Sequence, residues 1–267
     1  MIVLYVAATP IGNLQDVSPN LRNIFGKCDF ILCEDTRRTS QLLHALGISG
    51  KKLFSLHGHN EIQVSLGYIE RMKQGETAIL VSDAGTPAIS DPGYFLVCSA
   101  HKASIPVRVI AGPSAVTSAM SVSGFSHPFH FLGFAPRKEG LLRQKLIHMS
   151  HYEGALIFFE SGQRIGNLIA VIADLMPERE ICLCRELTKL YEEIQRGFPH
   201  EFSTEPRKGE CVLIIGSGMP IQNQEDASLT SKTPLKQLAV QLADLWGMNK
   251  RDAYNLLQSI KPKKDLD

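Results

Sequence analysis

The stretch of sequence that decides the fold covers residues 78–93 and reads AILVSDAGTPAISDPG. It opens with an apolar run, which is typical of a strand buried on both faces of a sheet. Two glycines and two prolines follow and fix an unusual backbone path, on which the backbone can approach a ligand closely. We therefore expect a buried strand over Ala78–Val81 that leads into a functional loop, with two ordinary turns as the alternative.

Short apolar runs of the same character recur along the chain. They lie at Ile2–Ala7, Phe30–Cys33, Val107–Ile110, Ala155–Phe159, Ile181–Cys184 and Cys211–Ile215. Segments with helical periodicity lie between several of them, at Leu42–Leu46, Val64–Met72, Leu141–Met149 and Ile165–Leu175. Alternating strands and helices predict an α/β fold. Ligands of open α/β sheets bind outside the carboxyl ends of the strands, so the polar loops after these runs are the first candidates for a site.

The chain is predicted to divide into two α/β domains and an extension. We expect an N-terminal domain over residues 1–115, a second over residues 116–218 and a polar linker over residues 219–233. Residues 234–267 form the extension, with two amphipathic helices at Pro234–Trp246 and Lys250–Ile260. The spacing of these helices suits a helix-turn-helix-like appendage, and a helical pair that packs on the body is the alternative.

The composition is that of an ordinary globular protein, with 44% hydrophobic residues and a net charge of +1. This balance argues against a protein that coats nucleic acid electrostatically, although a local basic face would suffice for an RNA substrate. The six cysteines form no CxxC pair, which favours a reduced cytoplasmic chain. The apolar start has no basic region before it, and no apolar run is long enough to span a bilayer, so we expect no signal peptide and no membrane partner.

Several motifs bear on the ligand. The sequence has no GxxxxGK[ST] phosphate loop and no GxGxxG after the first strand, so a nucleoside ligand without phosphates is favoured over a nucleoside triphosphate or a dinucleotide. The segment HGHNE at residues 57–61 lacks a third ligand at a sensible spacing, and we predict no metal site. A basic cluster, Pro136–Gly140 with Arg143 and Lys145, is either a solvated helix face or an edge that contacts RNA.

Seven ordered segments together resemble one family. They are ATPIGNL at 8–14, EDTR at 34–37, HGHNE at 57–61, the loop at 82–93, GPSA at 112–115, GF at 133–134 with PRK at 136–138, and RELTK at 185–189. This order resembles the ribosomal RNA small subunit methyltransferase I family, in the tetrapyrrole methylase, or class III methyltransferase, superfamily. The resemblance runs from residue 3 to about residue 216, and the C-terminal helical pair is similar as well.

The resemblance implies a two-domain tetrapyrrole methylase-like fold with S-adenosylmethionine in the cleft between the domains, a small C-terminal helical extension and usually a homodimer. It implies 2′-O-methylation of a cytidine ribose in the decoding region of 16S rRNA, on the small ribosomal subunit, and no DNA partner. By position in the motifs, it assigns these residues to the cofactor: Pro10, Asp83, Ala84, Gly85, Thr86, Pro87, Ser114, Ala115, Phe159, Leu187, Glu210 and Cys211.

The catalytic group is the part that the motifs leave open. A sulfonium donor is already activated, so methyl transfer depends mainly on alignment, and a base or a cation near the ribose hydroxyl should help. We expect Glu186 and Lys189 to contribute, with Arg37 as a third candidate and Glu34 and Asp35 as further strand-end candidates.

Two departures from the family pattern affect the assignment. Gly162-Gln163-Arg164 stands where relatives usually have Pro-His-Arg, so no role of that histidine applies here, and Ala111 replaces a common proline before Gly112.

Two alternatives remain for the function. One is a corrinoid-precursor or diphthamide-type methylase of the same superfamily, against which the EDTR and RELTK motifs argue. The other is a non-catalytic ribosome-assembly factor, against which the intact cofactor loops argue.

Overall fold

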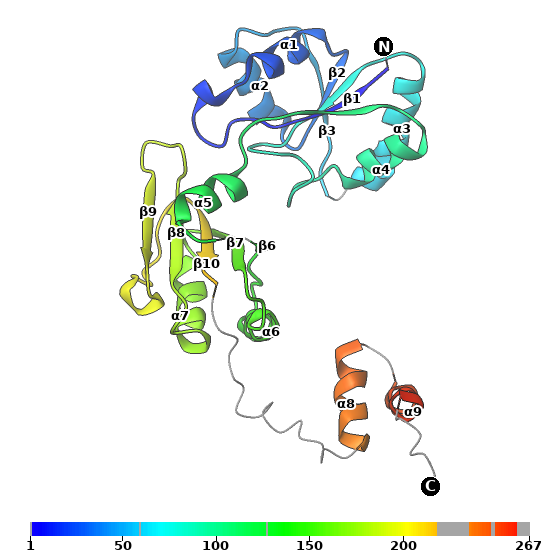
Figure 1. Cartoon of the computed structure of the whole chain (residues 1–267). Helices are drawn as coiled ribbons and strands as arrows, with labels where there is room; N and C mark the ends of the chain where they lie inside the picture. Colours follow the sequence, from blue (N-terminus) through cyan, green and yellow to red (C-terminus); the bar gives the residue numbers. More distant parts are fainter. Residues whose placement is uncertain (1, 59, 127, 218–234, 247–248, 261–267) are drawn as a thin grey trace. The chain divides into compact units, whose positions relative to one another are not determined.

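A computed structural model of the protein describes residues 2–58, 60–126, 128–217, 235–246 and 249–260 (Figure 1). Residues 1–219 form one compact unit and residues 220–267 form another. Both sheets of the fold belong to the first unit, so the expected boundary between residues 115 and 116 stays a prediction. The expected linker at 219–233 lies outside the described residues.

The first sheet is entirely parallel, with the strand order β3-β2-β4-β1-β5. Its strands are β1 (Leu4–Ala7), β2 (Phe30–Cys33), β3 (Lys52–Ser55), β4 (Ala78–Leu80) and β5 (Val107–Ile110). The helices that alternate with them are α1 (Pro19–Lys27), α2 (Thr36–Ala45), α3 (Glu61–Lys73) and α4 (Tyr94–Lys102).

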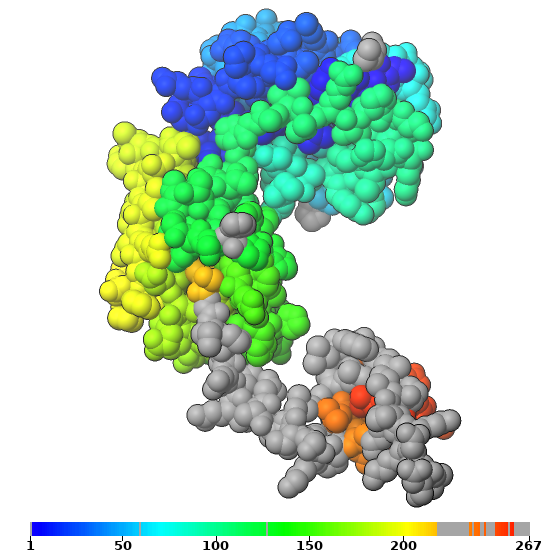
Figure 2. Space-filling model, viewed as in Figure 1, coloured from blue at the N-terminus to red at the C-terminus, as the bar shows by residue number. Residues whose placement is uncertain are grey.

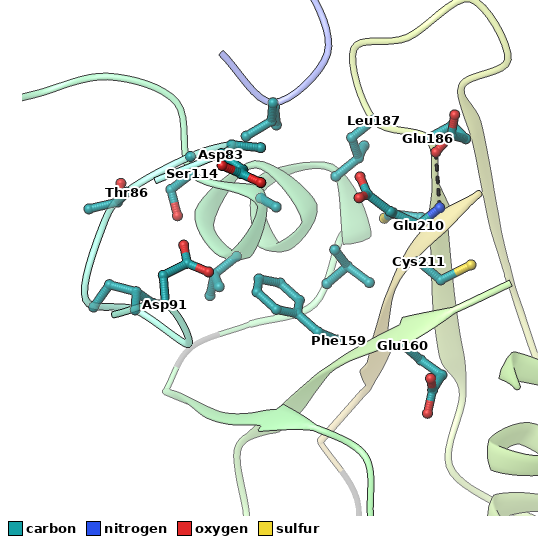
Figure 3. A pocket seen from close by; sticks show the side chains of 18 of the residues that line it. Asp83, Thr86, Asp91, Ser114, Phe159, Glu160, Glu186, Leu187, Glu210 and Cys211 are labelled. Atoms are coloured by element: carbon teal, nitrogen blue, oxygen red, sulfur yellow. Dashed lines mark hydrogen bonds between the residues drawn. The ribbon is translucent and has the colours of Figure 1, made fainter. Parts of the chain in front are cut away.

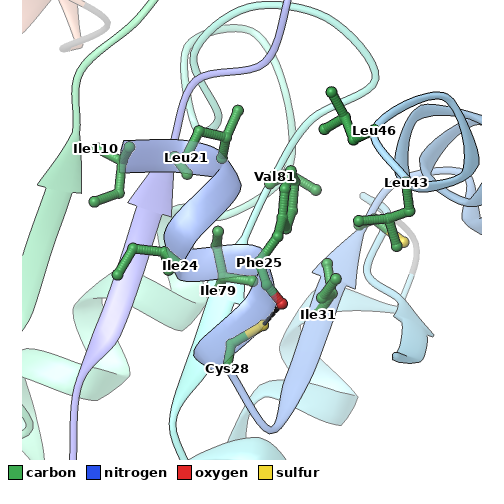
Figure 4. Close-up of a cluster of buried hydrophobic side chains, with 12 residues drawn as sticks. Leu21, Ile24, Phe25, Cys28, Ile31, Leu43, Leu46, Ile79, Val81 and Ile110 are labelled. Atoms are coloured by element: carbon green, nitrogen blue, oxygen red, sulfur yellow. Dashed lines mark hydrogen bonds between the residues drawn. The ribbon is translucent and has the colours of Figure 1, made fainter. Parts of the chain in front are cut away.

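Helices cover both faces of this sheet, which explains its continuous apolar runs. On one face, Ile31 and Ile79 pack with Phe25 of α1 and with residues of α2 (Figure 4). On the other face, the strands pack with residues of α3 and α4. Successive residues of a strand point to opposite faces, so every position of β2 and β4 is buried.

Strand β5 does not follow this rule, and the expectation that Val107–Ile110 is buried on both faces is wrong. Arg108 and Val109 are exposed, with Val109 accessible over 71% of its surface. The reason is position, because β5 is an edge strand that pairs only with β1.

The second sheet is mixed, with the strand order β6-β7-β10-β8-β9. Its strands are β6 (Phe129–Phe134), β7 (Ala155–Ser161), β8 (Ile181–Arg185), β9 (Glu193–Gly197) and β10 (Glu210–Ile215), with the helices α5 (Ala115–Ser123), α6 (Glu139–Met149) and α7 (Ile165–Leu175). Strand β10 runs antiparallel to both β7 and β8. Its first residues therefore lie beside the carboxyl ends of those strands, with Glu210 opposite Ser161 and Cys211 opposite Arg185.

The second compact unit contains α8 (Leu235–Trp246) and α9 (Lys250–Ile260), which agree with the two helices predicted there. They contact each other through the buried residues Ala239, Ala243 and Ala253. None of the helices in the described ranges is long and apolar enough to cross a membrane. Contact of this helical pair with RNA stays a prediction.

The loop at 82–93 is held by a buried carboxylate from α3. Ala88 (φ 62°) and Ser90 (φ 69°) adopt left-handed conformations, and so does Gly93 (φ 138°). Glu61, 7% exposed, accepts hydrogen bonds at Oε1 from the backbone N–H groups of Gly93 (3.0 Å), Phe95 (2.7 Å) and Leu96 (3.4 Å). Glu61 thus caps the start of α4 and fixes the end of the loop.

Replacement of Glu61 should destabilise the fold. Glu61→Ala leaves several backbone donors without their carboxylate, so the free energy of unfolding should fall by about 2–3 kcal/mol. Urea unfolding of the full chain measures this. The matched control is Glu70→Ala on the same helix, where the side chain is 64% exposed. Equal losses in the two variants would contradict the capping role.

Candidate functional site

A cavity of about 440 Å³ opens where strand ends of both sheets meet within the first unit (Figure 3). Loops after β1, β2, β4, β5 and β8 contribute to its lining, together with the ends of β6 and β7 and the start of β10. It has the size of sites that hold small-molecule ligands and cofactors.

Most of the residues predicted from the sequence line this cavity. They are Asp83, Ala84, Gly85, Thr86, Ser114, Ala115, Phe159, Glu186, Leu187, Lys189, Glu210 and Cys211. Pro10, Pro87 and Arg37 are not part of the lining, although Ile11 beside Pro10 is. The Arg37 side chain is 86% exposed and forms a 2.7 Å ion pair with Asp35. The roles assigned to all of these residues stay predictions.

Four loops of the first sheet are tied together to form one wall. Thr9 and Gly85 exchange backbone hydrogen bonds of 2.9 and 3.1 Å, which joins the loop after β1 to the loop after β4. The Thr86 hydroxyl donates to the Pro113 carbonyl at 3.3 Å, which adds the loop after β5. The carboxylate of Asp83 accepts from the Asp35 N–H at 3.1 Å, so the loop after β2 is held as well.

The opposite wall is the turn between β8 and β9. Glu186 (φ 51°) and Thr188 (φ 66°) adopt left-handed conformations, which are unfavourable for residues other than glycine. The Lys189 ammonium donates to Glu186 and to Glu210 at 2.8 Å each, and the Glu210 N–H donates to Glu186 at 2.9 Å. The hydrogen bond from Lys189 lowers the pKa of Glu186. This network holds the turn in its strained path.

Gly12 allows the two walls to meet. A Cβ atom at this position would lie 2.9 Å from the Leu187 carbonyl oxygen and 2.7 Å from the Thr188 hydroxyl. Figure 2 shows the N-terminal segment in blue beside the yellow β8–β9 hairpin at this contact. The absence of a side chain at Gly12 therefore permits the close approach of the loop after β1 to the turn that carries Leu187 and Lys189.

The lining is strongly acidic although the chain is nearly neutral. Its acidic side chains are Glu34, Asp83, Asp91, Glu186 and Glu210, against the basic Arg38 and Lys189, while the buried carboxylate of Glu160 is paired with Arg164. Burial, with a contribution from Glu34, raises the pKa of Asp91 to about 6. Burial and the charge of Asp83 also raise the pKa of Glu34. Such a cavity favours a cationic ligand and disfavours a polyphosphate.

Part of this lining is not predicted from the sequence. Asp91, Glu160 and Phe134 were not assigned to the site, although Asp91 stands in the quoted loop and Glu160 directly follows a predicted strand. For Asp91 and Glu160, the position after a predicted strand is the signal that could have placed them in the site. Within the described ranges, no group of three or more His, Cys, Asp or Glu side chains is arranged to hold a metal ion. His59 of the HGHNE segment lies outside the described residues.

Comparison with known proteins identifies the family. The sequence model of the family "Tetrapyrrole (Corrin/Porphyrin) Methylases" matches residues 3–201. The chain belongs to this family. The tetrapyrrole methylase-like fold expected from the sequence motifs is thereby confirmed, and the chain is a member of a methyltransferase family.

Curated relatives match most of this methylase chain. Proteins named "Ribosomal RNA small subunit methyltransferase I" from Xylella fastidiosa and Vibrio cholerae are 43% and 38% identical to it. The first alignment covers 79% of this chain and 80% of the relative, and the second covers 94% and 93%. The protein of the same name from Coprothermobacter proteolyticus is 39% identical over 80% of this chain and 97% of its own length.

Solved structures of other methylases share the fold at low sequence identity. The methyltransferase CobJ has a TM-score of 0.62 at 16% identity and covers 80% of this chain and 94% of its own. Diphthine synthase has a TM-score of 0.62 at 14% identity and covers 80% and 89%. At this level of identity the likeness concerns the fold alone.

The raised pKa of Asp91 predicts a pH-dependent ligand affinity. S-adenosylmethionine, the cofactor implied by the motifs, is a sulfonium cation, and a cation binds the ionised form of Asp91. Its affinity should therefore be highest well above pH 6, where Asp91 is ionised, and should decline as the pH falls through about 6 and Asp91 is protonated. Asp91→Asn should weaken binding at pH 7 about tenfold and flatten the pH dependence.

Isothermal titration calorimetry of the full chain between pH 5 and pH 7 tests this expectation. Asp174→Asn is the control, because Asp174 is 61% exposed and does not line the cavity. An unchanged dissociation constant of the unmodified protein across this range would rule the role of Asp91 out.

Proposed function

We propose that this methylase transfers a methyl group from S-adenosylmethionine to the ribose 2′-oxygen of a cytidine in the decoding region of 16S rRNA, on the assembled small subunit. The observation that carries the proposal is the 37–43% identity to relatives named ribosomal RNA small subunit methyltransferase I. The 2′-oxygen and the cytidine come from the resemblance of the motifs. The same resemblance supports a homodimer that acts in the cytoplasm.

The cavity suits the proposed cofactor in charge and in size. Five acidic against two basic lining side chains favour a sulfonium ligand, and a volume of about 440 Å³ matches a nucleoside with an amino-acid tail. The loop at Asp83–Thr86, Ser114 with Ala115, Phe159, Leu187, and Glu210 with Cys211 are the groups proposed to hold it. When bound, S-adenosylmethionine supplies an activated methyl group.

The chain's own residues then align the acceptor and receive its proton. Phe159 and Leu187 give the cavity apolar surfaces that exclude water around the reacting atoms. The acceptor oxygen would gain the methyl carbon as the bond from that carbon to the sulfonium sulfur breaks, so that a neutral thioether leaves with the electron pair of that bond. The acceptor hydroxyl would release its proton to a carboxylate and then to solvent. We assign the carboxylate to Glu186, which lines the cavity beside Lys189. We assign two tasks to Lys189: it orients Glu186 through their hydrogen bond, and it offsets negative charge on the acceptor oxygen.

Arg37 is the least supported of the three proposed catalytic residues. Its guanidinium lies outside the cavity lining and is engaged by Asp35. A role of Arg37 in the reaction would require its ion pair to open when RNA binds.

The alternatives receive less support. A corrinoid-precursor or diphthamide-type methylase is supported by the description of the family model and by structures at 14–16% identity, whereas the relatives at 37–43% identity are all named as ribosomal RNA methyltransferases. A non-catalytic assembly factor would have no need of an acidic cavity of cofactor size beside the strand ends.

The substrate can be tested by label transfer. The full chain is incubated with S-adenosylmethionine labelled in the methyl group and with undermethylated small subunits, naked 16S rRNA or a corrinoid precursor. We expect label on the small subunit, at a cytidine ribose, mapped by nuclease digestion and mass spectrometry. Label on a base, or only on the corrinoid precursor, would contradict the proposal.

The catalytic pair can be tested by substitution. Glu186→Gln and Lys189→Ala should each lower turnover at saturating cofactor roughly 100-fold, the size expected for a lost proton acceptor or its partner. Glu178→Gln, an exposed position, is the control. Near-normal turnover in both variants with cofactor bound would remove them from the mechanism.

A further inference from the structure

Phe134 lines the cavity and is 61% exposed, an unusual combination for a large aromatic side chain. Full burial of a phenylalanine side chain would contribute about 1.5–3 kcal/mol, so its exposure here forgoes much of that gain. Its ring lies 5.6 Å from the ring of Phe159, at an interplanar angle of 67°. Phe159 thus supports Phe134 while more than half of the Phe134 surface stays accessible.

A bulge in β6 sets the direction of Phe134. Phe131 pairs with Ile157 and Phe134 pairs with Phe159, so β6 has one residue more than β7 between the two pairs. The extra residue is accommodated with Gly133 in a left-handed conformation (φ 69°), which glycine adopts without strain. Bulges of this kind re-aim side chains next to functional sites.

The segment after Phe134 is anchored by a buried ion pair. Arg164 donates to the carbonyl oxygens of Ala135 (2.9 Å) and Pro136 (3.3 Å). The same guanidinium pairs at 2.8 Å with Glu160, whose side chain is 2% exposed. The backbone that carries Phe134 therefore has a fixed position at the edge of the cavity, and ligand contact there requires little ordering.

Two cations follow directly on this anchored segment. Arg137 and Lys138 are exposed, and neither forms an ion pair with another residue that the structure describes. The other members of the predicted basic cluster are engaged, since Arg143 pairs with Glu139 and Asp174 and Lys145 donates to the Leu132 carbonyl at 2.8 Å. Only the first two cations of the cluster are thus open to an anionic ligand.

We propose that Phe134 stacks on a nucleobase of the RNA substrate and that Arg137 and Lys138 bind the phosphates beside it. This inference rests on the proposed function, because it takes RNA as the methyl acceptor. Unpaired bases are recognised in proteins by stacking on aromatic side chains, and cations next to such a platform hold the backbone. The edge formed by residues 134–138 selects the acceptor, while the acidic cavity behind it selects the cofactor.

The ring of Phe134 could instead stack on the adenine of the cofactor, and the two roles differ in what a substitution changes. Phe134→Ala in the full chain should raise the KM for undermethylated small subunits about 5- to 100-fold. The dissociation constant for S-adenosylmethionine, from calorimetry, should stay within twofold. Phe134→Tyr should restore the KM, because it keeps the aromatic face, whereas Phe134→Leu should not.

The cations are tested by the salt dependence of RNA binding. The double variant Arg137→Ala/Lys138→Ala should bind the small subunit more weakly. The slope of log affinity against the logarithm of the salt concentration is negative, and it should become shallower by about 1.4, the value for two single-strand phosphate contacts. Arg143→Ala is the matched control, one turn further along the chain in α6, and should leave the slope unchanged.

The outcomes separate this inference from the proposed function. If the unmodified chain labels no rRNA, the proposed function fails, and this inference falls with it. If the unmodified chain methylates the small subunit but Phe134→Ala keeps its KM, only the inference is wrong. If Phe134→Ala weakens cofactor binding as strongly as it raises the KM, the ring belongs to the cofactor site and the inference is also overturned.

Discussion

The structure depends on the path of the loop at 82–93, which passes through left-handed conformations at Gly85, Ala88, Ser90 and Gly93. Such a path is costly away from glycine and persists only where its surroundings impose it. The bridge to Thr9 holds its start, and the buried carboxylate of Glu61 holds its end. The loops after β1, β2 and β5 each bond to its first half. The cavity is therefore a consequence of one strained backbone segment that is restrained at both ends.

Charge divides the site into two regions. The cavity concentrates carboxylates in a chain whose net charge is +1, and its two basic side chains are both engaged in ion pairs with those carboxylates. The open cations Arg137 and Lys138 lie on the segment that follows Phe134 at its edge. The proposed cofactor is a cation and the proposed acceptor a polyanion, and the two are attracted to opposite charges, so this separation would allow one site to bind both. A neutral overall composition is compatible with both partners for the same reason.

The sequence predicts the strands that helices cover on both faces, since only these are continuously apolar. It does not reveal β3, β6 or β9, whose residues are partly exposed and mixed in polarity, and it overestimates the burial of the edge strand β5. In the site, the rule that ligands bind at the carboxyl ends of strands predicts the loop at 83–86. The same rule cannot predict Glu210, because Glu210 begins a strand and lines the cavity only because β10 is antiparallel. Glu210 is predicted only through the family resemblance, and Phe134 is not predicted because the direction of its side chain depends on a bulge.

Residues 162–164 connect the edge of the cavity to the segment at 207–209. Gly162 exchanges backbone hydrogen bonds of 2.8 Å with the segment at 207–209, and a Cβ atom there would lie 2.5 Å from the Arg207 carbonyl oxygen. Gln163 donates to that same carbonyl at 3.0 Å. Both residues thus bind the segment that leads into β10, while Arg164 anchors the edge that carries Phe134. The three consecutive residues therefore connect the cavity edge, through β7, to the segment that leads into β10.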